Sequence, residues 1–507
     1  MPKDYLSNID TALLRLEHPT NLMMVTGAMI FKTPLSLADL KRTIQHGLLH
    51  IDRFRQRVVS PTLSPCNPHW EFDPSFNLDY HVQRTVLPPP YDTDSLQNLI
   101  SLLASTPLNF SKPVWQFHLV EQYGEGSALI CRLHHCIADG MALVHVALSM
   151  TETVPNTPLP GAVPDLSLRR NGHRRGAYNS LRSRLRSRRR AAQKVIQEGL
   201  QTISQPDRVK PYVEAGTESA LILGKFMLLE PDHDTVLRGK LGVQKRVTWS
   251  RGVHLSNIAV IRRKFGGGTV NDVLLTAISG ALRQYLLERG DSVEDLIMRA
   301  VIPVNLRPAG AESELGNQMG SIFLPLPIET EDPIERLQII EQLMNERKSS
   351  PEAKLFFHLL NALGMAPQKT ANSLISVFST RATTVITNVR GPKQRLYMAR
   401  SPLETILYWV PQTGRLGIGV SIISYMGEVR IGVITDAGLV PDPGKIIELF
   451  HQEFGNLYDI AQNTAGKQTM QQASAILNDA LVKLEAILEE KEAQQPPFPE
   501  QLSVQDE

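Results

Sequence analysis

Two adjacent histidines, followed by an aspartate and a glycine, form the stretch best suited to chemistry: His134-His135-Cys136-Ile137-Ala138-Asp139-Gly140. The unperturbed pKa of an imidazole lies near neutral pH, so a histidine can accept a proton from a hydroxyl or thiol within reach. An aspartate on the following turn can bond backbone N–H groups or pair with an arginine. The segment therefore indicates general-base catalysis.

The flanking sequence predicts a strand, a tight turn and a helix around these residues. An apolar run over Ser127–Leu133 predicts a buried strand, and Met141–Met150, rich in Ala, Leu and Met, predicts a helix. A second strand, Gln116–Gln122, is joined to the first through Tyr123-Gly124-Glu125-Gly126, which predicts a hairpin. The histidines then follow a strand end, where binding sites are commonly built.

Strand geometry separates the two imidazoles. Successive side chains on a strand point to opposite faces, so His135 shares a face with Leu133 and Cys131, whereas His134 shares the other face with Arg132. We therefore expect one histidine to accept the proton and the other to support the framework. A histidine on an apolar strand can also be an ordinary hydrogen-bonded core residue, and that alternative stays open at this point.

Other chemistries fit this sequence poorly. We expect no zinc site at His134, His135 and Asp139, because adjacent strand side chains diverge and no cysteine has ligand spacing. The chain has no Gly-x-Ser-x-Gly elbow, and Phe265-Gly266-Gly267-Gly268 lacks the lysine of a phosphate loop and predicts a turn. A base without a protein nucleophile fits direct attack by an acceptor hydroxyl on an activated acyl group.

Size and composition predict a large intracellular protein. The chain has 507 residues, 42% of them hydrophobic and 21% charged, with a net charge of +2. That length allows two or more domains. Its three cysteines, Cys66, Cys131 and Cys136, are odd in number and argue for a reducing compartment. No apolar run reaches the roughly 18 residues needed to cross a bilayer, so we expect any membrane contact to be peripheral.

Both halves of the chain mix strands and helices, which predicts an α/β protein with mixed sheets and a cleft between two similar domains. We predict an N-terminal domain over 1–165, a basic linker over 166–212 and a C-terminal domain over 213–465. Residues 466–507 predict an amphipathic helix, Gln471–Lys491, and a disordered tail.

The predicted linker carries a run of basic residues from Arg169 to Lys194 with no acidic residue inside it. Such a run can be a solvated connection, or it can dock on anionic lipid headgroups. Nucleic-acid binding is disfavoured, because Tyr178 is the only aromatic residue there that could stack on a base.

The histidine motif resembles the signature of the CoA-dependent acyltransferase superfamily, which includes chloramphenicol acetyltransferase and peptide-synthetase condensation domains. Further segments, in order along the chain, resemble the bacterial wax ester synthase/diacylglycerol acyltransferase family. They are Leu6-Ser7 to Asp10 with Leu13, Glu17-His18-Pro19 with Met23, Pro113-Val114-Trp115, Asn271-Asp272-Val273-Leu274-Leu275-Thr276, Pro303-Val304-Asn305-Leu306-Arg307, Gly316-Asn317, Thr387-Asn388-Val389-Arg390-Gly391-Pro392 and Asp442. The family usually has proline where Arg390 stands, so the local loop shape is expected to differ.

This resemblance implies two chloramphenicol-acetyltransferase-like domains with a catalytic tunnel between them. Acyl-CoA would enter from one side as a substrate, so no cofactor or metal is expected, and a long-chain alcohol or diacylglycerol would enter from the other. By motif position His135 is the expected base. His134, Asp139 and Gly140 would hold the framework, with Asp139 tied to an arginine.

Four residues outside the motif are further candidates. Asn271, at a predicted helix start where N–H groups are positive, could stabilise an oxyanion, although it could equally be a helix cap. Trp115, Asp272 and Cys131 are predicted to bind substrate, although Trp115 could equally be a core residue.

The expected activity is transfer of a long-chain acyl group from acyl-CoA to a fatty alcohol or diacylglycerol, giving wax ester or triacylglycerol. The resemblance also implies a cytoplasmic protein at the surface of the inner membrane or of lipid inclusions. One alternative is a condensation-type domain that forms amides from carrier-protein thioesters. Another is a non-catalytic lipid-surface protein, against which the intact histidine motif weighs.

Overall fold

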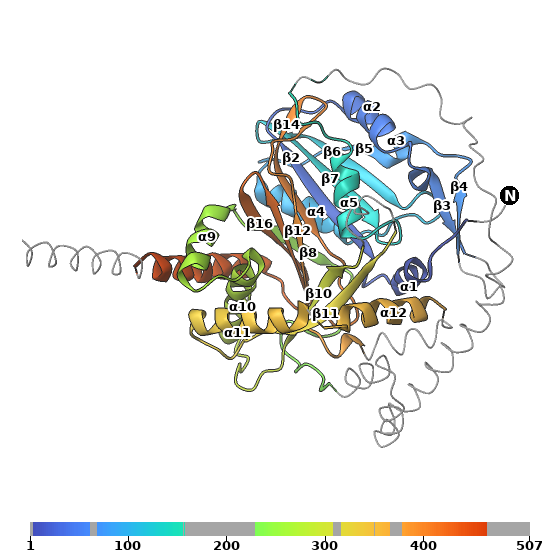
Figure 1. Cartoon of the computed structure of the whole chain (residues 1–507). Helices are drawn as coiled ribbons and strands as arrows, with labels where there is room; N and C mark the ends of the chain where they lie inside the picture. The colour runs from blue at the N-terminus through green and yellow to red at the C-terminus, as the bar shows by residue number, and fades with distance from the viewer. Residues whose placement is uncertain are drawn as a thin grey trace, which may run out of the picture.

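The computed structural model describes residues 4–60, 68–155, 157, 229–307, 316–348, 350–365 and 378–463 (Figure 1). Within these ranges the chain forms two large mixed β-sheets and a small three-stranded sheet, with helices packed against them. This arrangement confirms the predicted α/β class with mixed sheets. The basic run 169–194, the predicted linker 166–212 and the predicted C-terminal helix and tail lie outside the described residues.

The first large sheet has six strands, in the order β13-β14-β2-β7-β6-β5. In chain order they are β2 (Met24–Phe31), β5 (Val82–Thr85), β6 (Trp115–Tyr123), β7 (Gly126–His134), β13 (Tyr397–Met398) and β14 (Ser401–Trp409). The pairing of β6 with β7 is antiparallel and confirms the predicted hairpin. The helices of this half are α1 (Asn8–Leu16), α2 (Leu37–Gly47), α3 (Leu78–His81), α4 (Thr93–Ala104) and α5 (Gly140–Leu148), with a 3₁₀ turn at Asp52–Arg55.

Strand β14 comes from the second half of the sequence but belongs to the sheet of the first half. It runs antiparallel to β2, from Leu403 opposite Phe31 to Trp409 opposite Thr26, and the orange strand lies beside the blue one in Figure 1. The sequence did not lead us to expect a strand here. A division of the chain at residues 166–212 therefore does not give two self-contained sheets, since the first sheet takes β14 from beyond that boundary.

The second large sheet has the strand order β11-β10-β12-β15-β16-β8, and β9 pairs with β16. Its strands are β8 (Lys245–Trp249), β9 (Val253–His254), β10 (Arg299–Asn305), β11 (Met319–Pro325), β12 (Thr384–Arg390), β15 (Ile418–Tyr425) and β16 (Glu428–Asp436). In the sequence, two strand-like runs on either side of Met426-Gly427 predict a hairpin. The structure confirms it, with φ of 50° and 84° at the two turn residues. Two consecutive positive φ angles are what a two-residue hairpin loop requires.

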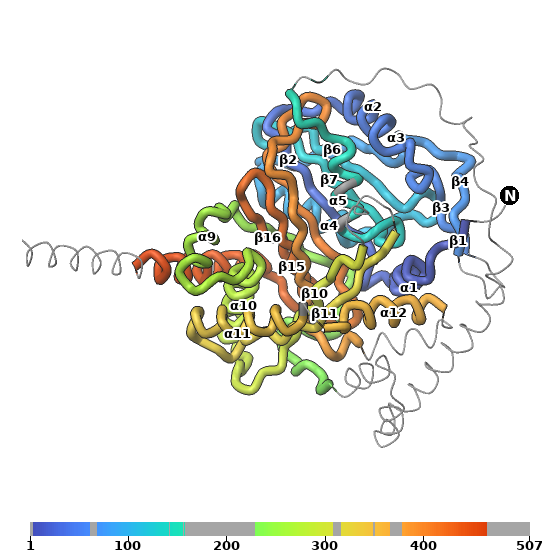
Figure 2. The backbone as a smooth tube through the Cα atoms, in the orientation of Figure 1, coloured from blue at the N-terminus to red at the C-terminus, as the bar shows by residue number. Residues whose placement is uncertain are grey.

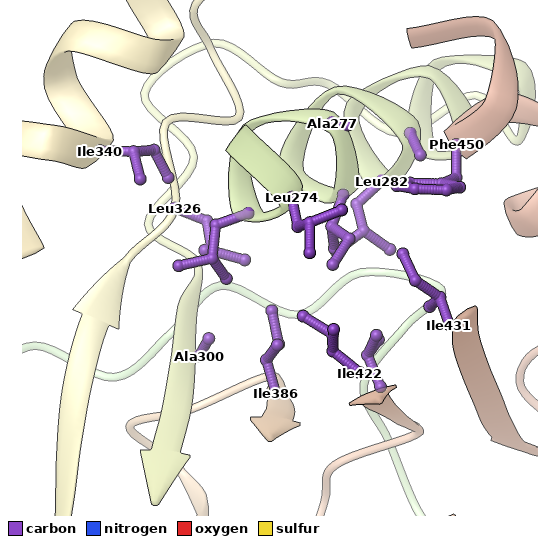
Figure 3. Packing of buried hydrophobic residues seen from close by; sticks show 14 of the residues in the cluster. Leu274, Ala277, Leu282, Ala300, Leu326, Ile340, Ile386, Ile422, Ile431 and Phe450 are labelled. Atoms are coloured by element: carbon purple, nitrogen blue, oxygen red, sulfur yellow. The ribbon is translucent and has the colours of Figure 1, made fainter. Parts of the chain in front are cut away.

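Helix α10 (Val270–Glu288) packs across the second sheet and is buried along most of its length. Figure 3 shows Leu274 and Leu282 of this helix above Ile386 and Ile422 of the strands. The helix is capped by Thr269, whose hydroxyl accepts the Asp272 N–H while the Asp272 carboxylate accepts the Thr269 N–H. The alternative that Asn271 caps this helix is therefore wrong.

Besides α10 and α12 (Glu352–Met365), the described part of the second half has α9 (Leu255–Lys264), α11 (Pro333–Lys348) and a helix over residues 443–463. The tube in Figure 2 shows α9, α10, α11 and the last helix gathered on the same side of the second sheet. None of the helices in the described ranges combines the length and apolar character needed to cross a membrane.

The two halves are joined at two further places. Helix α1 packs on α12 (Glu352–Met365), where Asn8 Nδ2 donates to Asn361 Oδ1 at 2.8 Å. Gly364 is required there, because a Cβ atom would lie 1.7 Å from the Asn8 carbonyl oxygen. Elsewhere the Ser101 hydroxyl of α4 accepts the backbone N–H of Val247, on the outer strand β8.

The small sheet consists of β1 (Asp4–Tyr5), β3 (Gln56–Val59) and β4 (His69–Phe72).

Candidate active site

The turn between β7 and α5 is held by backbone hydrogen bonds and by one carboxylate. The backbone N–H of His135 donates to the carbonyl of Met23, the residue before neighbouring β2, at 2.7 Å. Asp139 Oδ1 accepts the Ala142 N–H at 3.1 Å, and the Asp139 carbonyl accepts the Leu143 N–H. A carboxylate at a helix N-terminus satisfies N–H groups that have no partner within the helix. Asp139 therefore fixes both the turn and the start of α5.

His134 ends β7 and is bonded into the framework. Its Nδ1 accepts the backbone N–H of Cys136 at 3.1 Å, so the ring proton lies on Nε2, which faces Glu17 Oε2 at 3.4 Å. The ring of Phe110 packs edge-on against the imidazole. The side chain is 1% exposed and does not line the main cavity. These contacts are those of a supporting residue.

His135 lines a cavity together with Asp139 and Gly140. Burial lowers the pKa of His135, and the negative charge of Asp139, the residue's own carbonyl and the Asn317 side chain oppose that effect. A lowered pKa keeps the imidazole neutral, which is the form that accepts a proton. Apart from its chain neighbours, a Cβ atom at Gly140 would meet nothing within 4 Å.

The arginine that the sequence predicted beside Asp139 is Arg307, from the second half of the chain. Its guanidinium bonds Asp139 Oδ2, and Oδ2 also accepts the Gln318 N–H at 3.2 Å. Both side chains are nearly fully buried, at 1% and 4% exposed. The expectation that Asp139 is tied to an arginine is confirmed, and this ion pair crosses between the two halves.

The cavity has a volume of about 270 Å³ and is lined by both halves of the chain. His135, Asp139 and Arg307 are among the lining residues, and the other walls are mostly aliphatic and aromatic. The apolar lining includes Leu13, Leu16, Val25, Phe323, Phe356, Leu360, Phe378, Val410 and Leu416. A mostly apolar pocket with a few convergent polar groups is the usual form of a small-molecule site.

Asn271 is placed next to this cavity but does not line it. Its Oδ1 accepts a hydrogen bond from Asn388 Nδ2 at 3.1 Å, and Asn388 is a lining residue at the carboxyl end of β12. Asn271 lies in the first turn of α10, where N–H groups carry partial positive charge. The pair therefore brings amide groups from two elements to the cavity edge.

The three residues predicted to bind substrate do not line the cavity. Trp115 is fully buried beneath the sheet, where its Nε1 donates to the Phe54 carbonyl at 2.9 Å and its ring stacks on His81. Cys131 lies in the core, and burial raises the pKa of its thiol to about 12. Asp272 is engaged in the α10 capping box. Their positions give structural roles, and the substrate-binding prediction for them is not supported.

Several residues at the site were not predicted as site residues. Asn317 donates from Nδ2 to the His135 carbonyl at 2.8 Å and to Asp10 Oδ1 at 2.7 Å. Tyr408 lies on β14, the strand of the second half that joins the first sheet. It lines the cavity and shares hydrogen bonds with Thr387. Asp10 and Asn317 stand in segments that carry the family resemblance, but residue order alone does not bring them to His135.

The described residues contain no group of three or more His, Cys, Asp or Glu side chains that could hold a metal ion. His134 faces Glu17 and His135 faces the cavity, so the two imidazoles do not converge on a common point.

Comparisons with known proteins match one family along most of the chain. The model of the wax ester synthase/diacylglycerol acyltransferase catalytic domain matches residues 6–274, and the model of the C-terminal domain of the same family matches 315–458. A probable diacylglycerol O-acyltransferase (tgs1) of Mycobacterium tuberculosis is 28% identical over 460 residues, covering 87% of this chain and 93% of the relative.

Solved structures show the same fold. A wax ester synthase/diacylglycerol acyltransferase from Marinobacter aquaeolei superposes with a TM-score of 0.64 at 22% identity, covering 90% of this chain and 100% of that one. A starter condensation domain of rhizomide synthetase, solved with C8-CoA and Leu-SNAC, gives 0.55 at 12% identity over 91% of this chain and 94% of that one. At these identities the likeness establishes the fold alone.

Proposed function

The chain belongs to the wax ester synthase/diacylglycerol acyltransferase family, and from that premise we propose that it transfers a long-chain acyl group from acyl-CoA to the hydroxyl of a fatty alcohol or diacylglycerol. One observation supports this most directly. A buried histidine with a lowered pKa lines a cavity whose walls are otherwise mostly apolar. A proton acceptor facing an apolar chamber suits a hydroxyl on a long hydrocarbon chain.

His135 is the proposed general base. Its neutral imidazole takes the proton of the acceptor hydroxyl as the oxygen attacks the thioester carbonyl carbon. The tetrahedral intermediate then collapses by breaking the carbon–sulfur bond, and the imidazolium returns the proton to the departing CoA thiolate. The products are one ester and one free thiol. The protein supplies no covalent nucleophile in this scheme, and acyl-CoA is a substrate, so no separate cofactor is needed.

The negative charge on the intermediate needs preorganised donors. Asn271 is our candidate, because its Oδ1 is engaged by Asn388 at the cavity edge and its amide Nδ2 is the remaining donor group. The first-turn N–H groups of α10 add positive potential in the same region. Asp139, Arg307, His134 and Gly140 keep the role of framework in this proposal.

Peripheral contact with a membrane or lipid inclusion is part of the proposal. Both expected acceptors are lipids that partition into such phases, and the basic run 169–194 could bind anionic headgroups.

The alternative is the chemistry of a condensation domain. Such a domain shares the fold of this chain at 12% identity, whereas the models of the acyltransferase family match this chain along most of its length.

The test uses purified full-length protein with palmitoyl-CoA and either hexadecanol or a dioleoyl diacylglycerol. Free CoA is followed with a thiol reagent, and the lipid product is identified by chromatography. We expect CoA release and a matching amount of ester with at least one acceptor. Stoichiometric ester is the decisive readout, because thioester hydrolysis also releases CoA. If neither acceptor gives ester, the proposed function is wrong.

A further inference from the structure

Asn317 is held in one orientation by two buried acceptors. Its Nδ2 group donates one hydrogen to the His135 carbonyl at 2.8 Å and the other to Asp10 Oδ1 at 2.7 Å. With the amide reversed, an oxygen would face two oxygens, so these contacts fix which end is the donor. Asn317 is 5% exposed and Asp10 7%, so water does not compete strongly for either side chain.

This orientation leaves one buried acceptor unused. Among the described residues, Asn317 Oδ1 has no hydrogen-bond partner, and neither does His135 Nδ1. Asn317 reaches the backbone of His135, and its side chain acts to raise the pKa of the His135 imidazole. A buried polar atom without a partner costs free energy, so this orientation of Asn317 rests on the two hydrogen bonds that its Nδ2 donates.

Asp10 in turn is fixed from two sides. It lies in the first turn of α1, where the Ser7 hydroxyl accepts its backbone N–H at 3.0 Å. Burial raises the pKa of Asp10, and its bond from Asn317 and the charge of Arg53 oppose that effect. Helix α1 thus presents a carboxylate to the amide that touches the base.

We propose that Asp10 and Asn317 are positioning residues for His135: Asn317, anchored by Asp10, holds the His135 carbonyl and thereby sets how the imidazole meets the cavity. The arrangement joins three elements, because Asp10 belongs to α1, His135 follows β7, and Asn317 precedes β11. The base is therefore set only when the second half has docked on the first. This inference rests on the proposed function, since it assumes that His135 is the base.

The test compares Asn317→Ala with the wild type in the palmitoyl-CoA assay. Misplacing a catalytic group by about 1 Å can cost roughly 100-fold in rate, so we expect kcat to fall by about 10- to 100-fold. KM for palmitoyl-CoA should change little. The acidic limb of the kcat/KM profile should move to lower pH, because the Asn317 side chain acts to raise the pKa of His135. The other charged or titratable groups acting on this imidazole are Asp139 and His134, and both are unchanged in the variant.

Asp10 supplies a second, independent comparison. Asp10→Ala removes the acceptor for Asn317 and should lower kcat, whereas Asp10→Asn keeps an oxygen in place and should retain most of it. The double variant Asp10→Ala/Asn317→Ala should lose no more than Asn317→Ala alone, since residues that act as a unit are not additive. If Asn317→Ala does not fold, the contrast between the two Asp10 variants decides.

The matched control is Asn361→Ala. This variant also removes an amide contact between α1 and the second half, but Asn361 does not line the cavity. We expect near-normal kcat and an unshifted pH profile. Equal losses in Asn317→Ala and Asn361→Ala, or an Asn317→Ala enzyme with normal kcat, would overturn the positioning role while leaving the proposed function intact. No ester from the wild-type enzyme would overturn both.

Discussion

The two adjacent histidines differ because of where the strand ends. His134 is the last residue of β7 and turns its ring into the protein, where Cys136 and Glu17 face its two nitrogens. His135 is the first residue of the turn and meets the cavity. Strand alternation predicted that the two would separate. The side to which each points agrees with the choice of His135 as the base, which activity measurements must now test.

Replacing His135 with alanine should remove most of the turnover without unfolding the protein. Loss of a general base typically lowers the rate by roughly 10²- to 10⁴-fold. The measurements are kcat with palmitoyl-CoA and the thermal midpoint. His254→Ala is the matched control, because His254 is exposed and does not line the cavity. Near-normal kcat in His135→Ala would show that another group is the base.

The pH dependence should reflect the lowered pKa of His135. Burial disfavours the charged imidazolium, so the neutral base persists below the ordinary value of 6.5 and is lost only as the pH falls through the lowered pKa. The acidic limb of kcat/KM should therefore lie below pH 6.5. A limb above that value would contradict the assignment, because it would require the protein to favour the protonated ring.

The buried pair of Asp139 and Arg307 should matter more for stability than an exposed pair. Removing Arg307 leaves Asp139 buried without its counter-charge, which typically costs about 3–5 kcal/mol. Arg415→Ala removes an ion pair to Asp234 in which the two side chains are 42% and 66% exposed, and the loss there should stay below about 1 kcal/mol. Urea unfolding of the Arg307→Ala and Arg415→Ala variants measures the loss of unfolding free energy in each. Equal losses would show that burial does not decide the strength of these ion pairs.

At the level of elements, β14 decides how the two halves depend on each other. Its pairing with β2 completes the first sheet, and Leu407 and Trp409 join a core cluster that also includes Val247 and Ile434 of the second half. Tyr408 of the same strand faces the cavity. One strand thus contributes to a sheet, a shared core and the site.

A fragment of residues 1–165 should not fold on its own, because β2 would present an unpaired edge and an uncovered apolar face. Circular dichroism of this fragment during thermal unfolding should show no cooperative transition. Mixing it with a fragment of residues 213–463, which contains β14, should restore a cooperative transition. A cooperative transition from fragment 1–165 alone would show that the first half is an independent domain after all.

At the scale of the whole molecule, the sequence predicts that its charge is unevenly distributed. The net charge is only +2, yet residues 169–194 hold a dense basic run. Neutralising its six arginines at positions 182, 184, 186, 188, 189 and 190 should weaken binding to vesicles containing anionic lipid, with most of the loss at low salt. Vesicle sedimentation measures this, and palmitoyl-CoA turnover with a short-chain, soluble alcohol serves as the control. If the vesicle binding is unchanged, the basic run 169–194 is only a linker.

Much of the local structure could be read from the sequence, because its signals are short-ranged. Alternating and apolar runs predicted β6, β7, β15 and β16, and glycine marked the Met426-Gly427 turn. Strand β14 was not expected, since its burial comes from β2 and from the second half, which are distant in sequence. The start of α10 was misread at Asn271, although Thr269 and Asp272 stand at the spacing of a capping box, whose two hydrogen bonds the structure shows.

By itself the sequence determined a strand, a turn and a helix that present His135, the need of Asp139 for an arginine, and the family to which the chain belongs. Only the tertiary structure decided that the arginine is Arg307, that Asn317 and Asp10 meet at the base, and that Trp115 and Cys131 are core residues. The reason is physical. Periodicity and turn chemistry act over a few residues, whereas ion pairs, buried amides and cavity walls join segments that meet only when the halves pack together.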